Sequence, residues 1–408
     1  MADKVLRLFV GLFVGVYVAR YLGPEKFGTL QFAMSFVALF GAFAKLGLDG
    51  IVVRNAVQDP DSRDELLGTA FGLRVIGGLV LLGVVFGGVQ LTGSEPLTQL
   101  IVMIIAVGHV LQAFQVIEFY FQSQVLARLA AIAGVAGLLA SAAFRLALIW
   151  SDAALIWFAL AVIVEHGLKG IALCFLYIKR RIPLWHWRFR LNQAKLLLRD
   201  SWPLIFSSMT VAIAMRVDQV MIKFFTEGSL AVGLYAAAVR IAETPQFLPV
   251  VISQSLFPAL ANVDINKRIE RYKASIVCFF WIFVFLCLLV CLFAKNIIAI
   301  FGSDYSQAYI ILQIYIWCLP FTTLNIFTNK MLLIDNLTRF IFYKQCTLAA
   351  INVILNIILL KKYGFVGAAI ATLSADIFIS LFIELFNKNS RYLFFLKLEA
   401  LIFKYKTV

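Results

Sequence analysis

Long apolar runs alternate with short polar breaks along the whole 408-residue chain. A helix needs about 20 predominantly apolar residues to cross a bilayer. Twelve segments reach that length, and the breaks between them, such as Leu22–Gly28 and Lys361–Gly364, carry turn signals. The segments are residues 5–22, 29–48, 66–91, 97–120, 129–150, 154–178, 201–222, 229–256, 274–294, 307–332, 340–360 and 365–386. The pattern predicts an all-α integral membrane protein with about twelve transmembrane helices.

Composition supports this prediction, because 62% of the residues are hydrophobic and only 14% are charged. Soluble domains are roughly 45–50% apolar and about 25% charged. The net charge of +14 is a topology signal. With the N-terminus in the cytoplasm, 25 of the 36 Lys and Arg residues lie on the cytoplasmic side, 6 on the other side and 5 within spans. This asymmetry predicts that both termini are cytoplasmic, and no nucleic-acid partner is needed to explain the charge.

The most basic break, residues 179–200, also divides the chain in half. Trp185 and Trp187 stand there among arginines, a composition typical of a segment lying along membrane headgroups. Plain interfacial anchoring and contact with an anionic lipid substrate both fit this composition. We predict an N-terminal six-helix bundle over residues 1–178, a cytoplasmic connecting loop over 179–200, and a C-terminal six-helix bundle with a short cytoplasmic tail over 201–408.

Ionisable residues inside membrane spans are costly and are therefore functional candidates. The basic ones are Arg74, Arg145, Lys169, Arg216 and Arg240. Arg74 lies about 12 Å into its span, with no acidic residue within four positions. Because a guanidinium matches phosphate oxygens, Arg74 and Arg240 are the first candidates to bind an anionic headgroup. Arg145 is close enough to a span end to extend toward the membrane surface instead.

The acidic candidates for ion coupling are Glu165, Asp218, Glu243 and Asp376. Glu165 and Lys169 are four positions apart, and Arg240 and Glu243 are three apart, so mutual neutralisation is the alternative to a functional role for each pair. Asp376 has no basic neighbour in the sequence. It is predicted either to carry a proton or to form a hydrogen bond to another helix.

Prolines and glycines add predictions about helix shape. Pro245 and Pro249 in the eighth span and Pro320 in the tenth predict kinks, since proline removes a backbone donor. Gly83 and Gly87 form a small-xxx-small pair, which predicts close packing against another helix.

No pattern for catalysis or metal binding is present in the sequence. The six cysteines lack CxxC spacing, the three histidines are scattered, and there is no Gly-x-Ser-x-Gly, Walker or HExxH motif. We therefore predict no enzymatic activity, no cofactor and no metal site.

Two motifs resemble a known family. Val18–Gly28 (VARYLGPEKFG), followed by Gln31-Phe32-Ala33, is similar to the first hairpin of polysaccharide-export flippases, and Tyr363–Thr372 (YGFVGAAIAT) is similar to the start of their last span. These are the Wzx-type O-antigen flippases of the multidrug/oligosaccharidyl-lipid/polysaccharide exporter superfamily. The resemblance implies a MATE-like, V-shaped pair of six-helix bundles in the bacterial inner membrane. It also implies a function, moving an undecaprenyl-diphosphate-linked oligosaccharide from the inner to the outer leaflet.

Two other functions remain open from the sequence. A multidrug/cation antiporter of the same superfamily would have an acid-dominated cavity, and a membrane glycan polymerase would have a long outer loop. The partners expected for a flippase are the lipid-linked oligosaccharide, membrane lipids, and polysaccharide polymerase and chain-length proteins.

Overall fold

A computed structural model of the chain describes residues 2–180, 183–226 and 228–401. Within these residues the chain is helical apart from short turns, and no strand is present. Nine helical stretches there are long and apolar enough to cross a bilayer. The prediction of an all-α, multi-pass membrane protein is confirmed.

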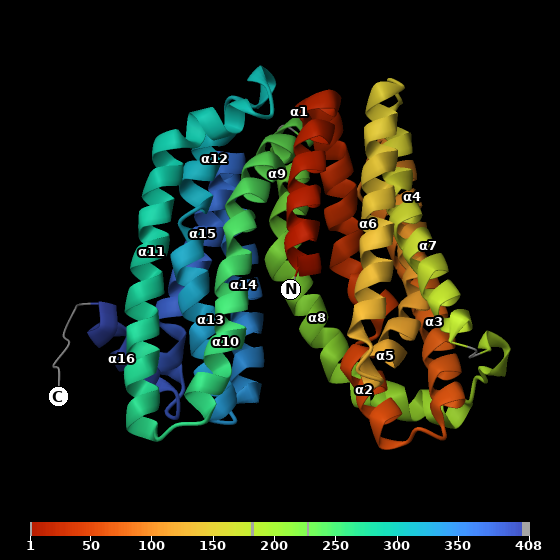
Figure 1. Cartoon of the computed structure of the whole chain (residues 1–408). Helices are drawn as coiled ribbons and strands as arrows, with labels where there is room; N and C mark the ends of the chain where they lie inside the picture. Colours follow the sequence, from red (N-terminus) through yellow and green to blue (C-terminus); the bar gives the residue numbers. More distant parts are fainter. Residues whose placement is uncertain (1, 181–182, 227, 402–408) are drawn as a thin grey trace. The chain divides into compact units, whose positions relative to one another are not determined.

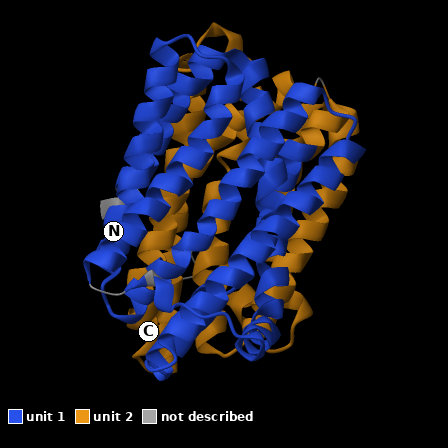
Figure 2. Ribbon diagram, turned by 90° about the vertical axis from the view of Figure 1, so that its right-hand side faces the viewer, with its two compact units in different colours: residues 1–220 blue, residues 221–408 orange. Residues whose placement is uncertain are grey.

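The chain divides into two compact units, Met1–Val220 and Met221–Val408 (Figure 2). The elements of unit 1 are α1 (Ala2–Lys45), α2 (Asp49–Gln58), α3 (Arg63–Leu91), α4 (Pro96–Val110), the 3-10 helix η1 (Leu111–Gln115), α5 (Val116–Ser123), α6 (Ala127–Trp150), α7 (Leu155–Lys179), η2 (Leu184–His186) and most of α8 (Leu191–Phe225). In this unit α6 and α7 run along one another (Figure 1), and α3 packs against α1 and α4. An apolar core includes Leu67 of α3, Phe121 of α5 and Tyr177 of α7.

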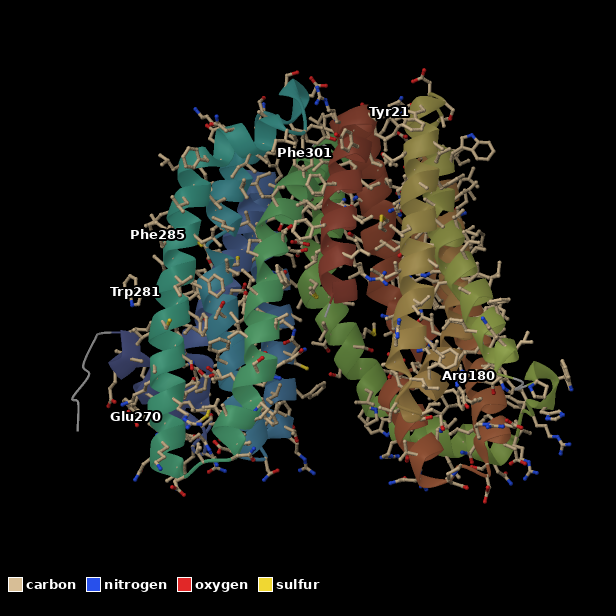
Figure 3. The ribbon with its side chains drawn as sticks, in the orientation of Figure 1. Tyr21, Arg180, Glu270, Trp281, Phe285 and Phe301 are labelled. Carbon is tan, nitrogen blue, oxygen red and sulfur yellow. The ribbon has the colours of Figure 1, made fainter. Side chains whose placement is uncertain are left out.

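Unit 2 contains the remaining elements. They are α9 (Ser229–Glu243), η3 (Thr244–Gln246), α10 (Phe247–Ala261), α11 (Ile265–Ala299), η4 (Ser303–Tyr305), α12 (Ala308–Tyr315), α13 (Cys318–Ile334), α14 (Thr338–Tyr363), α15 (Phe365–Leu381), η5 (Ile383–Phe386) and α16 (Arg391–Leu401). Trp281 and Phe285 project from the outer side of α11 and are 43% and 63% exposed (Figure 3). Large apolar side chains facing outward are expected where a helix contacts lipid.

The twelve predicted spans each coincide with one helix, one arm of a broken helix, or two helices joined end to end. The first two spans are the arms of α1, which breaks at Gly23, where φ is +71°. Glycine adopts this left-handed conformation without a Cβ penalty. Gly364 likewise adopts a left-handed conformation between α14 and α15, with φ of +58°. Both residues belong to the motifs that carry the family resemblance, so each motif marks a turn between helices.

The predicted proline kink in the eighth span is present. Pro245 lies in η3, the short 3-10 helix that joins α9 to α10. A regular α-helix would lack a backbone hydrogen bond at this position, because proline has no N–H donor. Pro320 lies in the first turn of α13, just after the break that separates α13 from α12. Proline is tolerated at that position because the first N–H groups of a helix have no partner within the helix.

Two local predictions were wrong. A Cβ atom added at Gly83 or Gly87 would meet nothing within 4 Å, so this pair makes no close helix contact. The segment predicted as a loop over residues 179–200 is helical from Leu191 onward, because α8 begins ten residues before the apolar run. The compact units divide at residue 220, and the predicted domain boundaries at 178 and 201 stay a prediction.

Candidate functional site

A set of charged and polar side chains lies among the apolar helices of unit 1. It is drawn from α1, α2, α3, η1, α5, α6 and α7 and consists of Arg7, Asp49, Arg74, Gln112, Glu118, Arg145, Glu165, His166 and Lys169. We call this set the unit 1 polar network. Three of the five predicted basic residues and one of the four predicted acidic residues belong to it.

Arg74 is the most buried member of the network, with 2% of its surface exposed. Its guanidinium forms an ion pair with Asp49 of α2, donates to the backbone oxygen of Gln112 at 3.2 Å, and lies 4.7 Å above the Phe119 ring. Its Nε has no hydrogen-bond partner among the described residues. Arg74 therefore joins α3 to three other elements, and a ligand can reach its paired nitrogen only by displacing Asp49.

Lys169 pairs with a residue that the sequence analysis overlooked. Its Nζ lies 2.8 Å from the Glu118 carboxylate of α5, although Glu165 stands one helical turn away on α7. Glu165 lies 3.9 Å from Arg145 of α6 and 3.7 Å from Arg7 of α1. The expected neutralisation between Glu165 and Lys169 was wrong, since each finds its partner on another helix.

Close packing of α6 on α7 sets these distances. A Cβ atom at Gly137 would lie 2.7 Å from the Glu165 backbone oxygen and 3.0 Å from Lys169 Cβ, so only glycine fits there. Arg145, two turns along α6, is 22% exposed and faces Glu165. Arg145 therefore interacts with Glu165 inside the bundle and does not extend toward the membrane surface.

Two histidines lie between the Arg74 and Lys169 parts of the network. Gln112 Nε2 lies 3.1 Å from His166 Nε2, and the His166 ring lies 5.6 Å from the His109 ring. The sequence shows these histidines as scattered, because they are 57 positions apart. Helix packing of α4 on α7 brings them together.

The other predicted residues of unit 1 lie on α8. Asp218 is 3% exposed and accepts a hydrogen bond from the Gln219 backbone N–H at 2.8 Å. Gln219 in turn accepts one from Ser35 of α1 at 2.7 Å. Arg216 is partly buried two positions before Asp218.

In unit 2 the predicted residues lie on helices that pack together. Arg240 and Glu243 are near the end of α9, and Asp376 is on α15, which contacts α9. Thr322 of α13 donates to Asp376 at 3.3 Å. The predicted hydrogen bond from Asp376 to another helix is therefore present.

A further polar group joins α14 to α15. Asn356 donates to Asn352 Oδ1 at 3.0 Å, and Asn352 donates to Thr372 at 3.2 Å. All three side chains are buried. The spacing of Asn352 and Asn356, four positions apart in one span, predicts packing between helices in preference to sugar binding, and the structure places them between two helices.

One buried ionic cluster was missed entirely. Glu384 of η5 lies 2.7 Å from Lys344 of α14 and 2.6 Å from Lys397 of α16, and all three residues are at most 2% exposed. Burial lowers the pKa of Lys397 to about 8, Lys344 adds to this shift, and Glu384 opposes it. Both lysines are among the 25 basic residues predicted on the cytoplasmic side, since hydropathy does not reveal which charges fold inward.

Among the described residues, no group of three or more His, Cys, Asp or Glu side chains is arranged to hold a metal ion. The cysteines in this part of the chain are all free.

Comparisons with known proteins agree with this architecture. The model of the polysaccharide biosynthesis protein family matches residues 4–264. A protein of Escherichia coli (strain K12) named "Putative O-antigen transporter" is 23% identical over 412 residues, covering 92% of each chain.

Solved structures show the same fold. The lipid II flippase MurJ in an inward closed conformation matches with a TM-score of 0.80 and 17% identity, covering 98% of this chain and 90% of that one. An inward-facing multidrug resistance MATE family transporter of the MOP superfamily matches with a TM-score of 0.75 and 16% identity, covering 98% and 96%. The family model covers more than half of the chain, and the chain therefore belongs to the polysaccharide biosynthesis protein family and has a MATE-like fold.

Proposed function

We propose that the protein is a flippase that moves a lipid-linked oligosaccharide, carried on undecaprenyl diphosphate, from the inner to the outer leaflet of the bacterial inner membrane. Both termini lie in the cytoplasm in this proposal, as the distribution of Lys and Arg predicts. The family, the fold and the name of the Escherichia coli relative support it.

The observation that carries the proposal is the unit 1 polar network. Three cations, Arg74, Arg145 and Lys169, lie inside a bundle of apolar helices, whereas 44% of the Arg7 side chain is exposed. These four cations are balanced by only three carboxylates. Charges inside a membrane are costly and need partners. A diphosphate offers oxygens that bind guanidinium and ammonium groups as carboxylates do. The phosphates would replace Glu118 or Glu165 as partners of Lys169 and Arg145.

This exchange suggests how ion coupling would work. A carboxylate that loses its cation to the substrate is left as an uncompensated charge in an apolar bundle, and a coupling cation would take the place of the lost partner. Glu165 is the first candidate, because its two cations lie 3.7 and 3.9 Å away and are the more loosely held. Asp376, Glu243 and Asp218 are the candidates outside the network.

Bent helices support a cycle of alternating access. Transporters of repeated bundles commonly bind at mid-membrane and expose the site to one side at a time. The breaks at η1 and η3 give α4–α5 and α9–α10 places to bend. Arg216 of unit 1 and Arg240 of unit 2 are the other basic candidates for substrate binding in this proposal.

The experiment uses a host deleted for this gene and complemented with variants. Surface polysaccharide is run on a gel, and lipid extracts are assayed for undecaprenyl-linked repeat units. Loss of polymer with accumulation of single lipid-linked units, both restored by the wild-type gene, is the expected result. Normal single units capped at the surface would assign the protein to polymerisation instead. Unchanged polysaccharide with altered drug or cation sensitivity would support the antiporter.

A charge exchange separates substrate binding from structure. In the variant Lys169→Glu/Glu118→Lys the ion pair is kept but the cation moves from α7 to α5. We expect normal amounts of protein in the membrane with impaired flipping. Arg54→Gln is the matched control, because it removes an exposed ion pair to Asp200 at 3.2 Å that lies outside the network. Full flipping by the exchanged variant would remove Lys169 from the substrate site.

A further inference from the structure

A pocket of about 410 Å³ lies beside α3, outside the unit 1 polar network. Its lining consists of Gly68, Phe71, Gly72, Phe114, Trp187 and Phe189. Every one of these residues is aromatic or glycine, so the walls carry no charge. The volume is within the range of about 300–1,000 Å³ typical of small-molecule sites.

Two glycines one turn apart on α3 allow the segment that carries Trp187 and Phe189 to lie against this helix. A Cβ atom at Gly68 would lie 2.5 Å from the Arg188 backbone nitrogen, and one at Gly72 would lie 2.6 Å from the Phe189 ring. Real Cβ atoms do not approach other atoms so closely. The chain after α7 can therefore lie against α3 only because both positions lack a side chain.

Specific contacts hold that segment in place. Arg188 donates its backbone N–H to the backbone oxygen of Asp64 at 3.3 Å, and Arg190 donates its backbone N–H to the Thr69 hydroxyl at 3.1 Å. The Trp187 indole donates to the Tyr177 hydroxyl at 3.3 Å, and its ring lies 5.6 Å from the Phe71 ring. These contacts fix the aromatic walls and leave the pocket preformed.

The surroundings of the pocket are cationic. Arg190 pairs with Glu65 of α3, whereas the exposed Arg188 side chain has no ion-pair partner among the described residues. Arg180 is also exposed, where α7 ends (Figure 3). Phe189, which stands next to Arg188 in the chain and lines the pocket, is 46% exposed, so the pocket opens outward beside Arg188.

We propose that this pocket binds an anionic glycerophospholipid of the surrounding leaflet, with an acyl chain against Phe71, Phe114, Trp187 and Phe189 and the phosphate at Arg188. An apolar chain suits the site because sugar hydroxyls would find no free donor on these walls, since the Trp187 N–H is already used. The exposed guanidinium group of Arg188 suits a phosphate. The bound lipid is a fixed component of unit 1, separate from the transported substrate.

Fluorescence of Trp187 tests the proposal directly. Trp187 is kept while the other six tryptophans, Trp150, Trp157, Trp185, Trp202, Trp281 and Trp317, are changed to Phe. The protein is reconstituted into phosphatidylcholine vesicles that contain a minor fraction of phosphatidylglycerol with brominated acyl chains, which quench tryptophan on contact. A second set carries the bromine on phosphatidylcholine instead. A single-tryptophan variant that keeps only Trp157, which is 50% exposed on α7, reports ordinary lipid contact.

We expect brominated phosphatidylglycerol to quench Trp187 at about a threefold lower fraction than brominated phosphatidylcholine, a preference of the size that one exposed ion pair gives. Arg188→Gln should abolish the preference, and Arg199→Gln, an exposed cation on α8, should keep it. Trp157 should show no preference. Equal quenching of Trp187 by the two lipids, or none by either, would overturn the proposal.

Lipid that copurifies with the protein gives a second measurement. It uses the chain with all its tryptophans and so does not depend on folding of the single-tryptophan variants. Extracts of the wild-type protein should hold more phosphatidylglycerol per chain than extracts of Arg188→Gln or Phe189→Ala. Equal amounts in all three proteins would contradict the proposed site.

Discussion

Lys397 of α16 donates a hydrogen bond of 2.6 Å to the Glu384 carboxylate of η5, and neither residue is more than 1% exposed. Lys397 also donates to the backbone oxygen of Ser380, and Lys344 binds the other oxygen of Glu384 at 2.7 Å. One carboxylate therefore pairs with two buried lysine side chains. This cluster ties the last described helix to α14 and α15.

Removal of the shared carboxylate should be strongly destabilising. Glu384→Gln keeps the size of the side chain but leaves two buried ammonium groups without an anion, and breaking a buried ion pair in this way costs about 3–5 kcal/mol. We expect a clear fall in the thermal unfolding midpoint of the purified protein. Glu399→Gln is the control, since it removes the exposed pair with Lys273, a kind of pair worth about 0–1 kcal/mol. Equal midpoints for the two variants would mean that the cluster contributes little.

Stability should also depend on pH through Lys397. Its pKa in the folded protein is about 8, below its ordinary value of 10.5, because burial disfavours the charged form. Glu384 and Lys344 are the charged groups that face it. Between these two pKa values the unfolded chain binds more protons than the folded one, so stability rises as the pH rises through this window.

The measurement is the unfolding midpoint at pH 7.5 and pH 10 for the wild-type protein and for Lys397→Met. The wild-type protein should gain stability relative to the variant at the higher pH. Lys388→Met, which changes an exposed lysine beside the cluster, should follow the wild type. A gap between wild type and Lys397→Met that is the same at both pH values would rule out Lys397 as the titrating group.

The positions of the membrane spans along the chain could be predicted from the sequence, because the length of an apolar run shows whether a helix can cross a bilayer. The glycines at the turns, Gly23 and Gly364, could be located because a left-handed backbone favours glycine. Partners of charged residues could not be predicted in the same way. Lys169 binds Glu118, on α5, because α5 packs beside α7, and the sequence spacing favoured Glu165 instead.

Glycines illustrate the same limit for helix packing. The spacing of Gly83 and Gly87 on α3 matches a packing motif, yet both face open space, while the isolated-looking Gly137 on α6 lies against the α7 backbone. Spacing identifies glycines that share a face, but only the neighbouring helix decides whether that face is a contact. The unit 1 polar network depends on such contacts. For this reason some of its members could be predicted from the sequence, but their ion-pair partners could not.

Gly137→Leu should separate α6 from α7. Its added atoms would overlap the Glu165 backbone oxygen, which would lie 2.7 Å from the first of them, and overpacking of this kind typically costs about 1–3 kcal/mol. We expect a lower unfolding midpoint together with impaired flipping, because Glu165 and Lys169 move with α7. Gly83→Leu on α3 is the matched control and should leave both unchanged. A tolerated Gly137→Leu would show that α6 and α7 can separate without loss of the network.

Arg74 and Asp49 offer a test that separates a structural clamp from a substrate ligand. Asp49→Asn leaves the buried Arg74 without its carboxylate and should destabilise the protein, although by less than the loss of a fully buried pair because the Asp49 side chain is 61% exposed, whereas Arg74→Gln/Asp49→Asn removes both charges and should recover much of that loss. The exposed pair gives the control Arg54→Gln/Asp200→Asn, which should cost little at each step. The readouts are the unfolding midpoint and the surface polysaccharide of a complemented deletion host. If Arg74 binds the substrate diphosphate, the Arg74/Asp49 double variant is stable but exports no polymer. If the double variant is stable and exports normally, Arg74 serves only to hold α3 against its neighbours, and the phosphate site must be sought among Arg145, Lys169 and Arg7.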